Sequence, residues 1–95
     1  MSDPTLLVLA SLADGDKHGY AMMEDILRFA EVRLGPGTLY GAITRLEQRG
    51  WIRPVSCGNR RQPYTLTGAG RDYLNEQLEQ LEKVVKTGLA RLRHP

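Results

Sequence analysis

Two adjacent arginines, Arg60 and Arg61, have the clearest chemical potential in this 95-residue sequence. No acidic residue lies within ten positions on either side of them, so ion pairs with sequence neighbours do not neutralise their charge. They follow Cys57-Gly58-Asn59, which is typical of a turn. Guanidinium groups at an exposed turn are well suited to phosphate binding. We therefore predict a phosphate-binding tip, the alternative being a charged turn that only keeps the chain soluble.

A second set of polar residues falls on one face of a helix expected to begin at Pro36. Positions 38, 41, 45 and 48 share a face at helical spacing, and positions 40 and 44 lie beside it. The candidate interface residues on this surface are Thr38, Tyr40, Gly41, Thr44 and Arg45, with Gln48 beside them. Hydroxyls, an amide and an arginine without a carboxylate can contact phosphates and base edges. A solvated helix face is the alternative, and the neighbouring basic turn favours nucleic acid.

The distribution of charge supports the same interpretation better than the net charge of +2 does. Residues 1 to 27 hold five acids and one lysine, a net charge of −4. Residues 28 to 61 hold seven arginines and two glutamates, a net charge of +5, and residues 62 to 95 are nearly balanced at +1. The basic block contains both the polar helix face and the basic turn, which is the pattern expected of a duplex-binding protein.

The sequence argues against an enzyme, a metal site or a disulfide scaffold. Cys57 is the only cysteine, and His18 and His94 are isolated, so neither a disulfide nor a usual zinc site is expected. No nucleophile and base occur at a recognisable catalytic spacing, and no cofactor is expected. His18 is expected to help start a helix, and a redox role for Cys57 is a less favoured alternative to a small turn residue.

The elements that must position these residues are mainly helical. Apolar periodicity and Gly/Pro punctuation predict helices over residues 4 to 13, from Asp16 or His18 toward Arg33, and from Pro36 to about Gly50. A last helix is predicted after a Thr67 cap, with Gly68 and Gly70 weakening its first turn, and then runs from Arg71 to about Leu92. Tyr20, Met22 and Met23 recur at helical spacing and are expected to be core residues. Residues 51 to 56 and 64 to 67 are predicted as a two-stranded hairpin of short, edge-like strands, because Pro54 and Pro63 each lack an amide donor.

The last predicted helix carries an apolar seam. Leu74, Leu78, Leu81 and Val85 follow a 4-3-4 spacing, which Leu89 and Leu92 continue. At 1.5 Å per residue this helix is about 30 Å long, more than the preceding residues can cover with a small core. We therefore expect a second chain to cover its outer part.

The length and composition allow one compact domain. Apolar residues make up 41% and charged residues 25%, as in ordinary globular proteins. The chain has no apolar run near the 20 or so residues needed to cross a bilayer, and its first residues lack the basic region of a signal peptide. A cytoplasmic protein without a membrane partner is expected.

Four motifs occur together in one order: His18-Gly19-Tyr20, Gly37-Thr38-Leu39-Tyr40, Arg45-Leu46-Glu47, and Leu66-Thr67 followed by Gly70. In this respect residues 6 to 74 resemble the PadR family of bacterial transcriptional regulators. The resemblance implies a mainly α fold with a small β-hairpin: a winged helix-turn-helix over residues 1–67 and a C-terminal dimerisation helix over residues 68–95. Three positions depart from the family pattern, namely Gly35 at a common serine or threonine cap, Gly41 at a frequent proline, and Pro63 at a frequent tyrosine.

Together these observations predict a sequence-specific DNA-binding regulator. The family implies a homodimeric repressor that binds a pseudo-palindromic operator in double-stranded DNA and releases it on binding an effector. Some short members of the family hold flat aromatic ligands in a dimer-interface pore against an aromatic residue of the last helix. Here that helix offers only Tyr73, near its start, so the sequence does not identify a small-molecule effector. The alternative is a winged-helix protein-interaction module that does not bind DNA.

Overall fold

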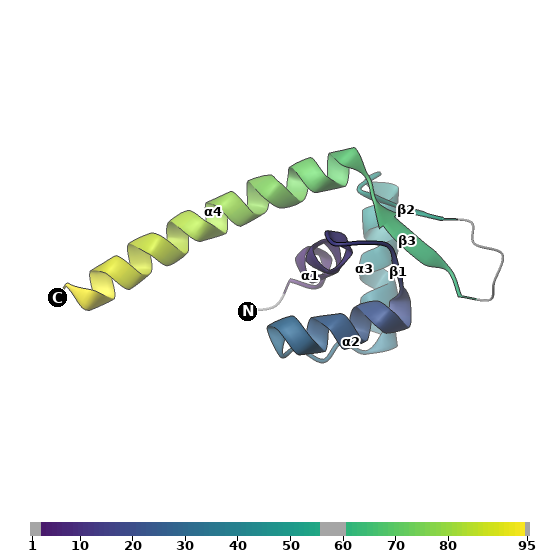
Figure 1. Cartoon of the computed structure of the whole chain (residues 1–95), viewed down its shortest axis with the longest axis horizontal. Helices are drawn as coiled ribbons and strands as arrows, with labels where there is room; N and C mark the ends of the chain where they lie inside the picture. Colours follow the sequence, from purple (N-terminus) through teal and green to yellow (C-terminus); the bar gives the residue numbers. More distant parts are fainter. Residues whose placement is uncertain (1–2, 56–60, 95) are drawn as a thin grey trace.

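Four helices and three short strands make up the fold of the computed structural model, which describes residues 3–55 and 61–94. The helices are Pro4–Leu12 (α1), Gly19–Ala30 (α2), Pro36–Gln48 (α3) and Gly68–Arg93 (α4). The strands are Lys17–His18 (β1), Ile52–Pro54 (β2) and Pro63–Leu66 (β3). Helices α1 to α3 and the sheet form a compact body, from which α4 projects on the side opposite to the hairpin (Figure 1). The mainly α, winged-helix prediction is confirmed.

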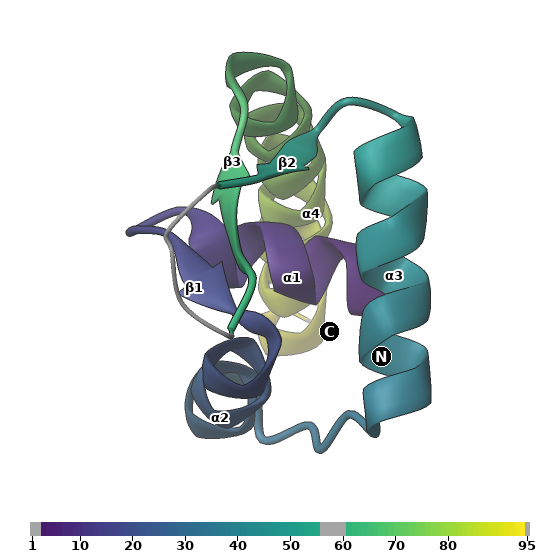
Figure 2. The ribbon, with the colours of Figure 1, turned by 90° about the vertical axis from the view of Figure 1, so that its right-hand side faces the viewer.

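Helix α1 lies at the centre of this body, where it packs against α2, α3, α4 and β3 (Figure 2). Its start is fixed by Asp3, whose carboxylate accepts a hydrogen bond from the Thr5 amide at 3.0 Å, and by Pro4 in the first turn. The core contains apolar side chains from all four helices, β2 and the connection between α2 and α3: Val8, Leu9, Leu12, Met22, Ile26, Leu34, Leu39, Ala42, Ile43, Leu46, Ile52 and Leu74.

The sheet has one strand more than the sequence predicts. Strand β3 is central, with β2 antiparallel on one side and β1 antiparallel on the other. Ile52 pairs with Leu66 and Pro54 with Tyr64, while Lys17 pairs with Tyr64 from the opposite edge. The predicted two-stranded hairpin is confirmed as the β2–β3 pair. Strand β1 was not predicted, because it is only two residues long and is defined by its pairing with a distant segment.

A polar network holds β1 against the ends of α1 and α2. The buried Ser11 hydroxyl donates to Asp25 Oδ2 at 2.7 Å, and Lys17 Nζ donates to the Ser11 carbonyl oxygen. Lys17 also donates to Asp14 Oδ1 at 2.5 Å, and this hydrogen bond lowers the pKa of the Asp14 carboxyl. The network fixes the connection that leads into α2.

The second helix is shorter than predicted. His18 starts it as expected, with Nδ1 accepting from the Ala21 amide at 3.3 Å. It ends at Ala30 rather than near Arg33, because Glu31 adopts a left-handed conformation (φ 56°) and its amide closes on the Leu27 carbonyl at 3.1 Å. Met22 is fully buried as predicted, whereas Tyr20 is 59% exposed, so its assignment to the core is wrong.

Helix α4 begins at Gly68, directly after the predicted cap. The predicted cap is confirmed, since the Thr67 hydroxyl accepts from the Gly70 amide at 3.1 Å. Leu74 is only 5% exposed and belongs to the core of this chain, so it is not open to a second one as the seam prediction requires. The other seam residues are 37 to 81% exposed: Leu78, Leu81, Val85, Leu89 and Leu92. None of the helices formed by the described residues combines the length and apolar character needed to span a bilayer.

Candidate nucleic-acid interface

Helix α3 presents a polar surface on the side away from its four core residues. Thr38, Tyr40, Thr44 and Arg45 are exposed, and Gly41 is half-buried. The Thr44 hydroxyl donates to the Tyr40 carbonyl oxygen at 2.9 Å, which leaves its oxygen as an outward acceptor. Gly35 provides no side-chain hydrogen bond to the first turn, so α3 starts without the cap that a serine or threonine would supply. The predicted polar face is therefore present and accessible.

Tyr40 lies against the first residue of α2. Gly19 is buried, and a Cβ atom at this position would come within 2.3 Å of the Tyr40 hydroxyl oxygen and 2.7 Å of Cζ. Only glycine therefore allows the phenol to rest there. This contact brings the His18-Gly19-Tyr20 and Gly37-Thr38-Leu39-Tyr40 motifs together, and it orients Tyr40 at one edge of the polar face of α3.

We expect Gly19→Ala to displace Tyr40 without unfolding the chain, because the clashing atoms are the far end of a flexible side chain. A stability loss of about 1 kcal/mol is expected, at the low end of the cost of adding a methyl group at a close contact. Thermal unfolding and the tyrosine NMR signals would measure the two effects. Gly37→Ala is the matched control, since a Cβ there meets nothing within 4 Å. An undisturbed Tyr40 signal in Gly19→Ala would contradict this packing.

Arg61 lies at the same edge of the polar face of α3 as Tyr40, in the segment that leads into β3. Its side chain is exposed, and Nη1 lies 3.3 Å from Nε2 of His18. An open hollow of 460 Å³ is lined by residues of α2, α3 and the hairpin: His18, Gly19, Tyr20, Tyr40, Arg61 and Gln62. Two predicted interface residues 21 positions apart in sequence, Tyr40 and Arg61, therefore line one surface. Arg60 and Cys57 lie outside the described residues.

Strand β3 places a second phenol, Tyr64, close to this edge. Burial raises the pKa of the Tyr64 phenol, and the charge of Glu47 and the neighbouring Tyr40 raise it further. The Tyr64 hydroxyl therefore stays protonated at neutral pH, so it adds no negative charge that would repel an anionic partner.

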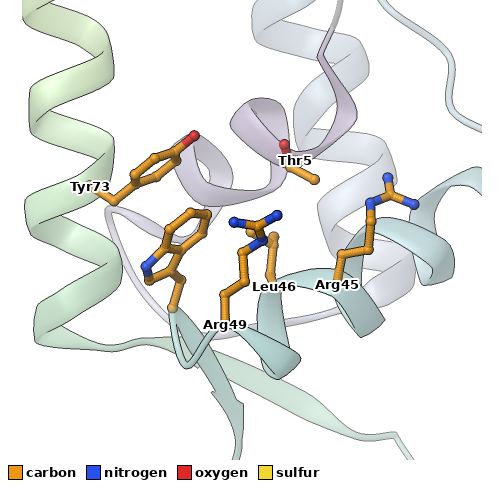
Figure 3. A pocket seen from close by; sticks show the side chains of 6 residues that line it. Thr5, Arg45, Leu46, Arg49 and Tyr73 are labelled. Atoms are coloured by element: carbon orange, nitrogen blue, oxygen red, sulfur yellow. The ribbon is translucent and has the colours of Figure 1, made fainter.

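The Arg45 side chain extends along α3 toward Gly41, where a Cβ atom would lie 3.7 Å from its Nη1 (Figure 3). It lines a pocket of 200 Å³ with residues of α1, α3, α4 and the connection between α3 and β2: Thr5, Leu46, Arg49, Trp51 and Tyr73. Sequence reasoning missed Arg49, Trp51 and Tyr73 as a group. The available signal was the four-residue spacing of Arg45 and Arg49, which places both guanidinium groups on one edge of a helix.

The described residues hold no cluster of three or more His, Cys, Asp or Glu side chains arranged for a metal ion. The polar groups of this surface are instead hydroxyls, an amide and guanidinium groups, which are the groups that contact DNA phosphates and base edges.

Comparison with known proteins identifies the family. The sequence profile of the Transcriptional regulator PadR-like family matches residues 8–76. The chain belongs to the PadR-like family. The Mycobacterium tuberculosis transcriptional regulator Rv3488 is 34% identical over 92 residues, which cover 94% of this chain and 85% of that protein. A PadR family transcription regulator from Clostridium difficile superposes with a TM-score of 0.83 at 28% identity, covering 94% of this chain and 97% of that one.

One relative is much longer than this chain. An uncharacterised 37.1 kDa protein of a Streptomyces fradiae transposon is 42% identical over 83 residues, which cover 87% of this chain but 24% of that protein.

A transcriptional regulator from Clostridium thermocellum superposes with a TM-score of 0.79 at 29% identity, covering 88% of this chain and 84% of that one. The PadR resemblance seen in the sequence motifs is thus confirmed. The PadR-like family consists of transcriptional regulators rather than enzymes.

Proposed function

We propose that this PadR-like chain is a DNA-binding repressor that acts as a homodimer on a pseudo-palindromic operator. The observation that carries the proposal is the accessible polar face of α3 beside Arg61, within a segment of net charge +5. In this arrangement α3 enters a major groove, with Thr38, Tyr40, Gly41, Thr44 and Arg45 on or beside the contacting surface. Arg60 and Arg61 contact the flanking backbone.

The outer part of α4 supports the dimer. Every residue from 78 to 94 is exposed, and the apolar residues of the stripe are 37 to 81% exposed. Most of the stability of a helix in a protein comes from tertiary packing of its apolar face. A second copy would cover the stripe formed by Leu78, Leu81, Val85, Leu89 and Leu92. Two-fold symmetry then places the two α3 helices about 34 Å apart, one turn of DNA.

A duplex from the region upstream of the chain's own coding sequence tests DNA binding. If the dimer neutralises about six phosphates, affinity should fall roughly 10³-fold between 50 and 200 mM salt. Arg61→Gln should weaken binding to all duplexes alike and reduce the magnitude of the salt slope by about one per subunit. Arg93→Gln is the matched control, because it removes the same charge from the far end of α4.

Fluorescence anisotropy of the labelled duplex gives both numbers, with thermal unfolding to show that each variant is folded. Salt-independent binding, or none, would contradict DNA recognition and would favour the protein-interaction alternative. An Arg61→Gln slope equal to that of the wild type would remove Arg61 from the phosphate-contacting groups.

A further inference from the structure

The pocket between α1, α3 and α4 contains two guanidinium groups one helical turn apart. Arg45 lies on α3 and Arg49 directly follows it as the C-cap residue. Both line a pocket with Thr5 of α1, Trp51 and Tyr73 (Figure 3). Both arginines are exposed. Like charges at this spacing on a helix repel each other, so an anion between them would be favoured by both.

No carboxylate neutralises this pair in residues 3–55 and 61–94. Neither guanidinium group forms an ion pair there, and the side chain of Arg49 lies over the Trp51 ring. The nearby Thr5 hydroxyl donates its proton to Asp3 Oδ1 at 2.6 Å, so it is not a donor for a ligand. The binding capacity of the pocket therefore lies in the two arginines.

Arg49 is held in place by aromatic side chains. Its guanidinium carbon lies 5.3 Å from the centre of the Trp51 ring, and that ring stacks on Tyr73 with centroids 3.7 Å apart and planes 14° apart. Stacking reduces the rotamer entropy that Arg49 loses when it binds an anion. Because the indole is already packed on Tyr73 and covered by the guanidinium, it offers little surface to an aromatic ligand. The chemistry of the pocket therefore suits a small oxyanion.

We propose that Arg45 and Arg49 form a phosphate site for the DNA backbone beside the groove that α3 enters. This inference rests on the proposed function. The site lies at the C-terminal end of α3, and Arg45 is adjacent to Thr44 of the polar face. Two exposed guanidinium groups without enclosing walls bind a free phosphate weakly, whereas a duplex delivers its phosphate together with many other contacts. Arg49 thus extends the DNA contacts to the flank of α3 opposite Tyr40 and Arg61.

The salt dependence of duplex binding by the full chain tests this site. Arg49→Gln should weaken every duplex by a similar factor and reduce the magnitude of the salt slope by about one per subunit. Arg49→Lys should recover most of the slope, because lysine keeps the charge even though it loses the planar stack on Trp51. Arg93→Gln serves as the control for a general loss of charge. Thermal unfolding shows that each variant is folded.

The outcomes separate this site from the proposed function. A wild-type chain that shows no salt-dependent duplex binding would overturn the proposed function. A wild-type chain that binds, together with an Arg49→Gln variant of unchanged affinity and slope, would overturn only the phosphate site. Failure of Arg49→Lys to restore the slope would also overturn it, since the loss would then come from packing on Trp51.

A titration with inorganic phosphate identifies the source of the anion. Trp51 is the only tryptophan of the chain, and Arg49 lies over it, so its fluorescence reports an anion at this pocket. Without DNA we expect no saturable change in Trp51 fluorescence below about 1 mM phosphate. This corresponds to a binding free energy weaker than about 4 kcal/mol. Saturation at lower concentration, lost in Arg49→Gln, would overturn the DNA assignment in favour of a free phosphate compound.

Discussion

Gly70→Ala is expected to destabilise the chain by about 3 kcal/mol, at the upper end of the cost of overpacking a core. Gly70 is buried in the first turn of α4, and a Cβ there would lie 2.0 Å from the Trp51 carbonyl oxygen and 2.9 Å from Leu66 Cδ1. The Trp51 carbonyl oxygen also accepts the Thr67 amide at 3.1 Å, so it cannot move away without breaking the junction of β2 and α4. Thermal unfolding should show a decrease in melting temperature of roughly 10 to 20 °C.

Gly68→Ala is the matched control for this prediction. Gly68 lies in the same turn, is exposed, and has nothing within 4 Å of the added Cβ. Alanine should leave stability unchanged or raise it by up to about 1 kcal/mol through helix propensity. Both variants are compared at one protein concentration, because association would shift the melting temperature. A Gly70→Ala variant within about 0.5 kcal/mol of the wild type, the range of ordinary surface substitutions, would contradict the close packing of α4 on Trp51.

The parts of the fold that sequence could predict are those decided by local chemistry. Asp3 and Thr67 mark helix starts because their side chains accept hydrogen bonds from backbone amides two or three residues later. Pro4 marks the same start as Asp3, because its ring fixes a helical φ in the first turn. Strand β1 has no such signal, since Lys17 and His18 become a strand only by pairing with Tyr64 and Pro63. The end of α2 could not be predicted because Glu31 takes a left-handed conformation, which a sequence pattern normally assigns to glycine.

The candidate interface divides in the same way. The polar face of α3 follows from helical periodicity, so Thr38, Thr44 and Arg45 could be placed from sequence. The contact of Tyr40 with Gly19 and the stacking of Trp51 on Tyr73 join segments far apart in the chain. Periodicity also could not show that Leu74 packs into this chain's own core, whereas Leu78 lies beyond the reach of that core.

The double substitution Leu81→Asp with Val85→Asp is expected to convert the proposed dimer into a folded monomer. Both side chains lie on the exposed stripe of α4, which projects from the body of the chain (Figure 1), and they are 37% and 54% exposed. Their replacement removes no contact with the core around Leu9 and Leu39. Burying four carboxylates at a two-fold seam is strongly unfavourable, so association should be lost. Sedimentation equilibrium measures the mass directly.

The same variant should bind a two-half-site duplex on the order of 100-fold more weakly, because a monomer loses the effective concentration that links the two half-sites. Its affinity for a single half-site should equal that of a wild-type subunit, since α3 and the hairpin are unchanged. Thr87→Asp, on the opposite face of α4, adds a charge outside the stripe and should leave both mass and affinity as in the wild type. A double variant that remains dimeric would show that the chains associate through another surface, and Leu78, Leu81, Val85, Leu89 and Leu92 would then have no assigned partner.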